Sequence, residues 1–247
     1  MQPLNFATVW EATLAQFRAQ RSVLIPVGAA FLFLPQLVFG RVLGDSTPAE
    51  WFEGPGTLQA VLVLGLVLAT SIIGQLSIAA IALGSFGTGT VGDTLKEAAS
   101  RLPPALAGSL IQGIAFGFGL ILLIVPGLYM LGRLWLVVPL IVAETRDPLD
   151  AIRRSWELTR GRGLQIMGFV ALLLLGVLLL TLAAGGLASG LGALLALAIG
   201  TPEEGWGVSR WLVELVRTAV SAGLGLMLAL FVAELYRALK VAPPPEA

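Results

Sequence analysis

Histidine and cysteine are both absent from this 247-residue chain. Without histidine, the chain lacks the commonest general acid–base group and the commonest metal ligand. Without cysteine, disulfides and thiolate chemistry are excluded. The sequence also shows no nucleotide-binding loop, no metal-ligand set and no nucleophile–base pair. We therefore expect a protein that is not an enzyme, with no catalytic residues, no metal site and no cofactor.

Charge is scarce as well. Only 12 % of the residues are charged, and the net charge is zero, against roughly 25 % charged residues in soluble domains. With no basic excess, nucleic acid is not an expected partner. Hydrophobic residues make up 57 % of the chain and the mean hydropathy is +0.91. Because several apolar stretches reach the ~20 residues that cross a bilayer, the sequence predicts an all-α, polytopic membrane protein.

The apolar stretches predict six transmembrane helices, at about 22–42, 58–83, 105–125, 128–143, 164–184 and 209–239. Periodicity further predicts an interfacial helix over 5–21 and two short amphipathic helices over 94–102 and 148–160, the first with a capping box formed by Thr94 and Glu97. The short glycine-rich run 187–199 is expected to be re-entrant or interfacial. Residues 1–240 thus form one integral membrane helical domain, and 241–247 a disordered tail.

Arginine and lysine gather in the N-terminal helix, in 84–104, in 144–163 and in the tail, whereas the 44–57 and 201–208 loops are acidic. Positively charged segments are retained in the cytoplasm. The sequence therefore predicts a multi-pass protein of the bacterial cytoplasmic (inner) membrane with both termini cytoplasmic.

The densest charge lies in ETRDPLDAIRRSWELTRGRG, residues 144–163. Asp147 and Pro148 fit the first positions of a helix, and Gly161 fits its end. The pattern predicts an amphipathic helix with one apolar side, made of Leu149, Ile152, Trp156 and Thr159, and a charged side, made of Arg153, Arg154, Glu157 and Arg160. Two ion pairs at four-residue spacing are expected, Asp150–Arg154 and Arg153–Glu157.

This helix is the first candidate site. Arginine side chains near a membrane surface attract anionic headgroups, and tryptophan prefers the headgroup level. We expect an interface for lipids, anionic lipids included, made of Arg153, Arg154, Trp156, Arg160 and Arg162. A protein partner or a second copy of the chain is the alternative partner, and a passive topology signal is the alternative role.

Residues 95–102 and 148–155 are weakly similar to each other. A shift of 53 positions aligns Glu97 with Asp150 and Arg101 with Arg154. Internal duplication explains this likeness, and so does independent selection of an amphipathic helix before a span.

Polar side chains inside the predicted spans form the second and third candidate sites. An ionisable residue at membrane depth is a functional-site hypothesis, and Arg133, Glu214 and Arg217 fall at similar depths. They are expected to form one intramembrane cluster, or else Glu214 and Arg217 pair alone within one helical turn. Ser71, Gln75 and Gln112 are expected to line a polar seam, or to hydrogen-bond between helices.

The sequence from Val137 to Gly163 resembles a signature of uncharacterised bacterial integral membrane proteins. That family is similar to the membrane domain that precedes the catalytic barrel in some glycerophosphodiester phosphodiesterases. The matching positions are Pro139, Glu144, Pro148, Ala151, Arg154, Ser155, Trp156, Leu158, Thr159 and Gly161. The resemblance implies six spans and two cytoplasmic amphipathic helices. No catalytic barrel follows in this sequence, so the resemblance implies no diesterase activity.

Two classes of function therefore stay open. The first is a non-enzymatic protein of membrane or envelope homeostasis that binds lipids or a partner through its cytoplasmic amphipathic helices. The second is a transporter or lipid translocator that uses the Arg133, Glu214 and Arg217 cluster. Against the second, the sequence shows no clear inverted repeat, a common feature of transporter folds.

Overall fold

The computed structural model describes residues 5–43, 56–85, 90–199 and 208–241. Within these ranges all regular structure is helical. The elements are α1 (Phe6–Gly28), the π-helix η1 (Ala29–Phe33), α2 (Leu34–Leu43), α3 (Thr57–Leu83), α4 (Val91–Ser100), α5 (Leu102–Leu122), α6 (Ile124–Leu134), α7 (Val137–Ala143), α8 (Pro148–Leu158), α9 (Gly163–Ile199) and α10 (Val208–Val241).

Six helical segments of the described chain are long and apolar enough to cross a membrane: Phe6–Val42, Thr57–Leu83, Leu102–Leu122, Ile124–Ala143, Gly163–Leu194 and Trp211–Val241. Their lengths, at about 1.5 Å per residue, match or exceed the roughly 30 Å hydrocarbon core. The predicted all-α class is confirmed, and each of the six predicted spans corresponds to a helical segment long and apolar enough to cross a membrane.

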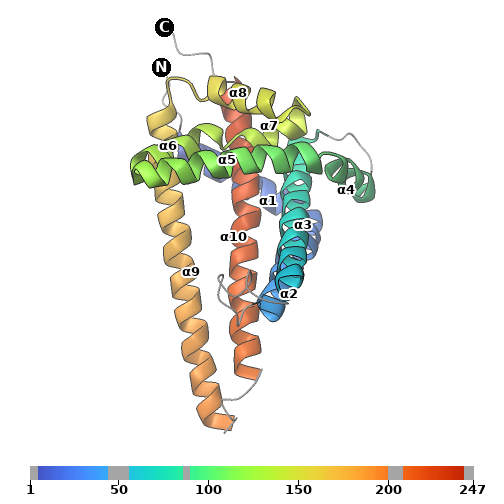
Figure 1. Cartoon of the computed structure of the whole chain (residues 1–247), viewed down its shortest axis with the longest axis vertical. Helices are drawn as coiled ribbons and strands as arrows, with labels where there is room; N and C mark the ends of the chain where they lie inside the picture. The colour runs from blue at the N-terminus through green and yellow to red at the C-terminus, as the bar shows by residue number, and fades with distance from the viewer. Residues whose placement is uncertain (1–4, 44–55, 86–89, 200–207, 242–247) are drawn as a thin grey trace.

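The helices have two orientations (Figure 1). α3, α9 and α10 lie along the long axis of the molecule, whereas α5 runs across them near one end. α5 and α6 form a tight hairpin, because a Cβ built on Gly119 would lie only 2.5 Å from Cα of Gly127. α8 covers this hairpin from outside. The sequence predicted the two spans at 105–125 and 128–143 but not their transverse orientation.

The first long helix is continuous. The predicted interfacial helix 5–21 and first span 22–42 merge into α1, η1 and α2, and Pro26 lies inside α1. Proline removes one backbone donor from the helix, and the wider π-helical turn follows three residues later. The N-terminal part of α1 lies at the same end of the molecule as α8, where Phe6 stacks on Phe169 of α9 with ring centroids 4.1 Å apart.

Two apolar clusters hold the helices together. The larger cluster surrounds the fully buried Leu140, Ile141 and Phe231, and joins α7 to α3, α9 and α10. The second cluster surrounds Leu24 and Leu230, and joins α1 to α3 and α10. Burial of such side chains from water stabilises a fold by about 1.5–3 kcal/mol each; within a bilayer, close packing replaces this driving force.

Two predicted boundaries were wrong. The run 187–199 is not a separate segment but the continuation of α9, which extends over 37 residues. Leucine and alanine, which favour helix, make up most of this run, and isolated glycines weaken a helix without ending it. The first amphipathic helix begins at Val91 instead of 94, because Thr90 and Asp93, not Thr94 and Glu97, form the capping box. The tail after 241 and most of the two acidic loops lie outside the described residues.

Candidate functional site

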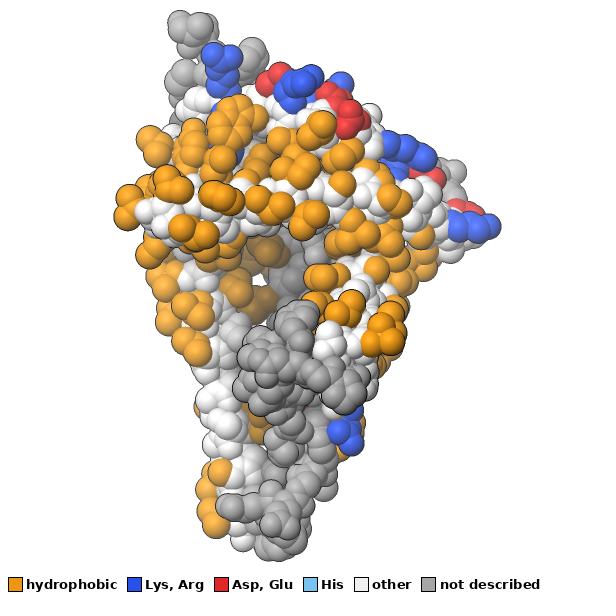
Figure 2. All heavy atoms as spheres, in the orientation of Figure 1, with side chains coloured by type: hydrophobic (Ala, Val, Ile, Leu, Met, Phe, Trp, Pro, Cys, Tyr) orange, Lys and Arg blue, Asp and Glu red, His pale blue; other side chains and the backbone are white. Residues whose placement is uncertain are grey.

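Charged side chains gather at one end of the molecule, over α8 and α4 (Figure 2). We call this region, made of α4, residues 144–162 and the last turns of α10, the charged end. α8 rests on α5, α6 and α7, with Ala151 and Ser155 fully buried. The Ser155 hydroxyl donates a 2.6 Å hydrogen bond to the carbonyl of Arg133. α8 is therefore fixed to the protein itself on one side.

The predicted apolar side of α8 was partly wrong. Thr159 is buried as expected, but Leu149 is 61 % exposed and Trp156 is also exposed. The small residues Ala151 and Ser155 take the inner positions instead, because α8 packs closely on the helices below it and only short side chains fit there. The prediction placed the large hydrophobic residues on the inner face of α8, and for Leu149 and Trp156 this was incorrect.

Of the two ion pairs predicted along α8, one is confirmed. Arg154 Nε lies 3.1 Å from Asp150 Oδ2, and Arg154 also donates a 2.6 Å hydrogen bond to Glu144. The Arg153–Glu157 pair was wrong, since these side chains make no ion pair within the described residues. Arg153 and Arg160 are exposed, Arg162 is half-buried, and none of the three has an ionic partner among the described residues.

Glu144 connects three helices at the charged end. It follows α7 directly and accepts hydrogen bonds from Arg154 of α8 and from Tyr236 and Lys240 of α10, the last at 2.9 Å. Burial raises the pKa of this carboxyl, but the three donors outweigh burial and lower the pKa to about 2. Tyr236 and Lys240 were missed from sequence, although their four-residue spacing on one helix face was the available signal.

Arg101 reaches the same place from the other side. Its guanidinium donates hydrogen bonds of 2.6 and 2.7 Å to the carbonyls of Ile141 and Val142, in the last turn of α7. Its Nε also binds Glu97, four residues earlier. Arg101 and Arg154, which the weak internal similarity aligns, thus both hold the C-terminal end of α7, where cations are favoured.

Arg133 is the most unusual charged residue of the described chain. It is only 4 % exposed, yet its side chain forms no hydrogen bond and no ion pair with any described residue, and its Nε is buried without a partner. Its guanidinium carbon lies 4.2 Å from the centroid of the Trp156 ring and 5.8 Å from that of Tyr129. Two aromatic rings thus lie close to this cation.

The surroundings of Arg133 form a cradle, which we call the arginine cradle: Tyr129, Arg133, Trp156, Arg160 and Gly163. A Cβ on Gly163, the first residue of α9, would lie 3.1 Å from the Tyr129 hydroxyl and 3.2 Å from Arg133 Cδ. The N-terminus of α9 therefore lies beside the Arg133 side chain. Arg160 follows Trp156 by four residues and is close enough for its charge to repel that of Arg133.

The predicted cluster of Arg133, Glu214 and Arg217 was wrong, and the alternative prediction, a pair of Glu214 and Arg217 within one helical turn, is confirmed. Glu214 instead accepts hydrogen bonds from Arg217 and Thr218 of its own helix, with Arg217 Nη2 3.0 Å away. It lies against Gly40 of α2, whereas Arg133 lies beneath α8 at the charged end. The span prediction placed Arg133 near the outer end of an upright helix. In the structure, α6 belongs to the transverse hairpin, so Arg133 does not reach the depth of Glu214.

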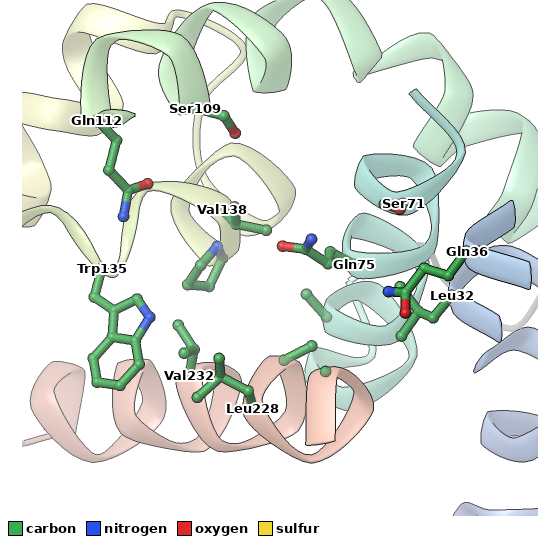
Figure 3. Close-up of a pocket in the computed structure, with 14 residues that line it drawn as sticks. Leu32, Gln36, Ser71, Gln75, Ser109, Gln112, Trp135, Val138, Leu228 and Val232 are labelled. Atoms are coloured by element: carbon green, nitrogen blue, oxygen red, sulfur yellow. The ribbon is translucent and has the colours of Figure 1, made fainter. Parts of the chain in front are cut away.

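The predicted polar seam is brought together. Ser71, Gln75 and Gln112 line one pocket of about 230 Å³ between α3, α5, α10 and the chain around Trp135. We call this pocket the polar chamber (Figure 3). Sequence reasoning missed Gln36, Ser109 and Trp135, which line it as well. Ser109 precedes Gln112 by three residues, and this spacing on one helix face was the available signal.

A family model described as a domain of unknown function (DUF7847) matches residues 55–239, about three quarters of the chain. No curated protein and no solved structure matches the chain. The resemblance to the membrane domain of glycerophosphodiester phosphodiesterases is not confirmed by these comparisons. The matched region contains α3 to α9 and nearly all of α10, and with them the arginine cradle and most of the polar chamber. The chain therefore belongs to the DUF7847 family.

Proposed function

We propose that this protein is a non-enzymatic membrane protein that binds the phosphate headgroup of an anionic lipid in the arginine cradle. The observation that carries the proposal is Arg133, a buried cation that makes no hydrogen bond or ion pair with the described residues. A buried charge is costly unless it is paired and hydrogen-bonded. Stacking on Trp156 recovers only about 2 kcal/mol or somewhat more of that cost.

A phosphate group meets the remaining requirements of the cradle. Arg133 and Arg160 repel each other, and an anion between them reverses that repulsion. The guanidinium offers planar donors that match phosphate oxygens. The N-terminus of α9, at Gly163, adds backbone N–H groups and the positive end of a helix dipole, which together favour anions.

The position in the fold favours a lipid over a soluble anion. The cradle lies between α6, α8 and the start of α9, where the apolar helices meet the charged end. Trp156 prefers this boundary between headgroups and hydrocarbon. Arg153 and Arg162 on the same segment add long-range attraction to an anionic leaflet, at about 1 kcal/mol per charge.

We place the charged end on the cytoplasmic side of a bacterial cell membrane, in keeping with its arginine content, and assign the protein to membrane homeostasis.

The test uses the purified full chain in neutral detergent. Added dioleoyl phosphatidylglycerol is expected to raise the midpoint of thermal unfolding, because a ligand that binds only the folded state stabilises it. Dioleoyl phosphatidylcholine and inorganic phosphate serve as the zwitterionic and soluble comparisons, and both are expected to act weakly. Arg160→Gln is expected to reduce the shift by at least half. Arg153→Gln, on α8 but outside the cradle, is expected to preserve it, because a neutral detergent micelle lacks the anionic leaflet that attracts Arg153.

An equal shift with phosphatidylcholine and phosphatidylglycerol contradicts recognition of the anionic headgroup. An equal shift in Arg160→Gln and Arg153→Gln contradicts the cradle as the binding site. A strong shift with inorganic phosphate alone assigns the cradle to a soluble anion instead of a lipid.

The transporter hypothesis loses its original basis, since Arg133 and Glu214 lie apart. The polar chamber gives a separate reason to consider small-molecule binding.

A further inference from the structure

Part of the lining of the polar chamber consists of uncharged hydrogen-bonding groups. Gln36, Ser71, Gln75, Ser109, Gln112 and Trp135 supply them from α2, α3, α5 and the segment before α7. In Figure 3, the amides of Gln75 and Gln112 and the indole nitrogen of Trp135 point into the same space. Among the described residues, no lysine, arginine, aspartate or glutamate lines the chamber.

These polar groups are not satisfied by one another. The side chains of all six residues make no hydrogen bond with any described residue. Gln75 lies eight residues before the end of α3, which places it about 12 Å below the charged end, at 1.5 Å per residue. At this depth an unpaired amide has no bulk water to bind, and leaving it unpaired is unfavourable. The chamber therefore requires a polar occupant.

The rest of the lining is apolar. It includes Leu32, Leu228 and Val232 together with Ala79, Ala229 and Gly225. An occupant that satisfies both kinds of lining is amphiphilic. The volume of about 230 Å³ exceeds the roughly 150 Å³ of an engineered cavity that holds benzene. It accommodates a glycerol-sized headgroup with the first atoms of attached chains, but not a whole lipid.

We infer that the polar chamber binds the uncharged, hydroxyl-bearing headgroup of a neutral glycerolipid such as diacylglycerol. A hydroxyl both donates and accepts hydrogen bonds, and each glutamine amide offers both functions in return. An ionised headgroup is excluded, because it would be desolvated in the chamber without a compensating charge. The chamber thus differs in ligand chemistry from the arginine cradle, and the inference does not rest on the phosphate site.

The experiment uses the full chain reconstituted in phosphatidylcholine vesicles with a photoactivatable dioleoylglycerol whose diazirine lies near the headgroup. After irradiation, mass spectrometry locates the labelled residues. We expect label on Trp135–Pro139 and on Leu228–Val232, and we expect unlabelled dioleoylglycerol to compete. Triolein, which lacks the hydroxyl, is expected to compete at least about fivefold less well, since each lost hydrogen bond weakens binding by roughly this factor.

Matched variants connect the label to the chamber. Gln75→Leu combined with Gln112→Leu is expected to lower the chamber labelling at least about fivefold. Gln59→Leu makes the same chemical change at an exposed position of α3 and is expected to leave labelling unchanged, as is Arg160→Gln in the arginine cradle. Ser109→Ala is a milder variant, expected to lower labelling about twofold, and serves if the double variant unfolds.

Three results overturn the inference. The first is equal chamber labelling in Gln59→Leu and in a folded Gln75→Leu/Gln112→Leu protein, and the second is equal competition by triolein and dioleoylglycerol. Label restricted to outward-facing residues such as Leu62 and Leu66 is the third, because it identifies ordinary surface lipid and leaves the chamber to water. If Arg160→Gln keeps the full stabilisation by phosphatidylglycerol while the chamber labelling is intact, only the phosphate proposal is contradicted.

Discussion

The guanidinium carbon of Arg133 lies 4.2 Å from the centroid of the Trp156 ring, and thereby joins α6 to α8. Trp156 also meets Tyr129 edge-on, with centroids 6.2 Å apart. The tryptophan thus covers a buried cation of its own protein, in addition to the role at the membrane surface that the sequence predicted. Because the cation is buried, the contact is stronger than an exposed cation–π pair.

The first prediction tests this contact by a double-mutant cycle. Trp156→Leu is expected to lower the free energy of unfolding by about 2 kcal/mol, part of which is the lost cation–π energy. In an Arg133→Met background the same change is expected to cost about 1–2 kcal/mol less, since no cation remains to be covered. Thermal or denaturant unfolding in detergent measures both steps. Equal effects of Trp156→Leu in the two backgrounds contradict the coupling.

The second prediction concerns Glu214. Because it pairs with Arg217 and Thr218, the energetic coupling between Arg133→Gln and Glu214→Gln is expected to vanish within the roughly 0.3–0.5 kcal/mol error of additivity. The coupling between Arg217→Gln and Glu214→Gln is expected to be about 0.2–1 kcal/mol, typical of a partly exposed ion pair. A measurable coupling of Glu214 with Arg133 would restore the three-residue cluster.

Sequence reasoning predicted those features that depend on composition and on local spacing. Six apolar helices, the helix at 148–160 and the Asp150–Arg154 pair all follow from hydropathy, end signals and four-residue periodicity. The polar seam was found because a lipophilic sequence makes each polar residue conspicuous.

The features that sequence reasoning missed depend on how helices are oriented in space. Arg133 and Glu214 have similar apparent depths only if both helices stand upright, and the transverse α5–α6 hairpin removes that condition. The bonds from Tyr236 and Lys240 to Glu144 join residues more than 90 positions apart. The four-residue spacing of Tyr236 and Lys240 indicates a shared helix face, but it does not indicate Glu144 as the partner. Likewise, Trp156 was assigned to the membrane because its cationic partner lies on another helix.

The third prediction concerns the acid stability that Glu144 confers. Its pKa is lowered from 4.5 to about 2 in the folded protein, so the folded state holds this carboxyl in its ionised form more strongly than the unfolded state. The resulting stabilisation is present above pH 4.5 and is lost as the pH falls toward 2. The thermal unfolding midpoint of the wild type is therefore expected to fall across this window.

Glu144→Gln is expected to reduce stability at pH 7 by about 1–3 kcal/mol, because Arg154 and Lys240 lose a charged acceptor. It is also expected to flatten the fall in unfolding midpoint between pH 4.5 and 2. Glu157→Gln is the matched control on α8, since the Glu157 side chain makes no ion pair within the described residues, and it is expected to behave like the wild type. The same acid sensitivity in Glu144→Gln and the wild type would assign the transition to other carboxyls.

The fourth prediction uses two glycines of α3. A Cβ on Gly74 would lie 2.7 Å from Cβ of Phe31 and 3.3 Å from Cδ2 of Leu32, whereas a Cβ on Gly65 meets nothing within 4 Å. Gly74→Ala is therefore expected to separate α3 from the first long helix and to lower stability by about 1–3 kcal/mol, the usual cost of overpacking. Gly65→Ala is expected to be neutral or stabilising by up to about 1 kcal/mol. Equal unfolding midpoints for the two variants contradict the close helix contact.

The last prediction concerns the tip of the α5–α6 hairpin. Five consecutive apolar residues from Ile121 to Val125 are between 61 and 82 % exposed, and the turn itself contains no polar side chain. Its backbone is nevertheless hydrogen-bonded, since the Leu123 amide donates to the Gly119 carbonyl and the Gly127 amide donates to the Leu123 carbonyl. A turn bonded in this way can lie in hydrocarbon, which excludes unpaired backbone groups.

We therefore expect the tip to lie in lipid and not at a water-facing surface. Because the chain lacks cysteine, Leu123→Cys introduces a unique thiol. It is expected to resist a membrane-impermeant maleimide in intact cells and in inside-out vesicles, yet to react with a lipid-soluble maleimide. Lys96→Cys, at an exposed position of α4, is the accessible control and is expected to react with the impermeant reagent in inside-out vesicles. Reaction of Leu123→Cys with the impermeant reagent in intact cells would mean that α5 and α6 each cross the membrane completely and carry this turn to the outer surface.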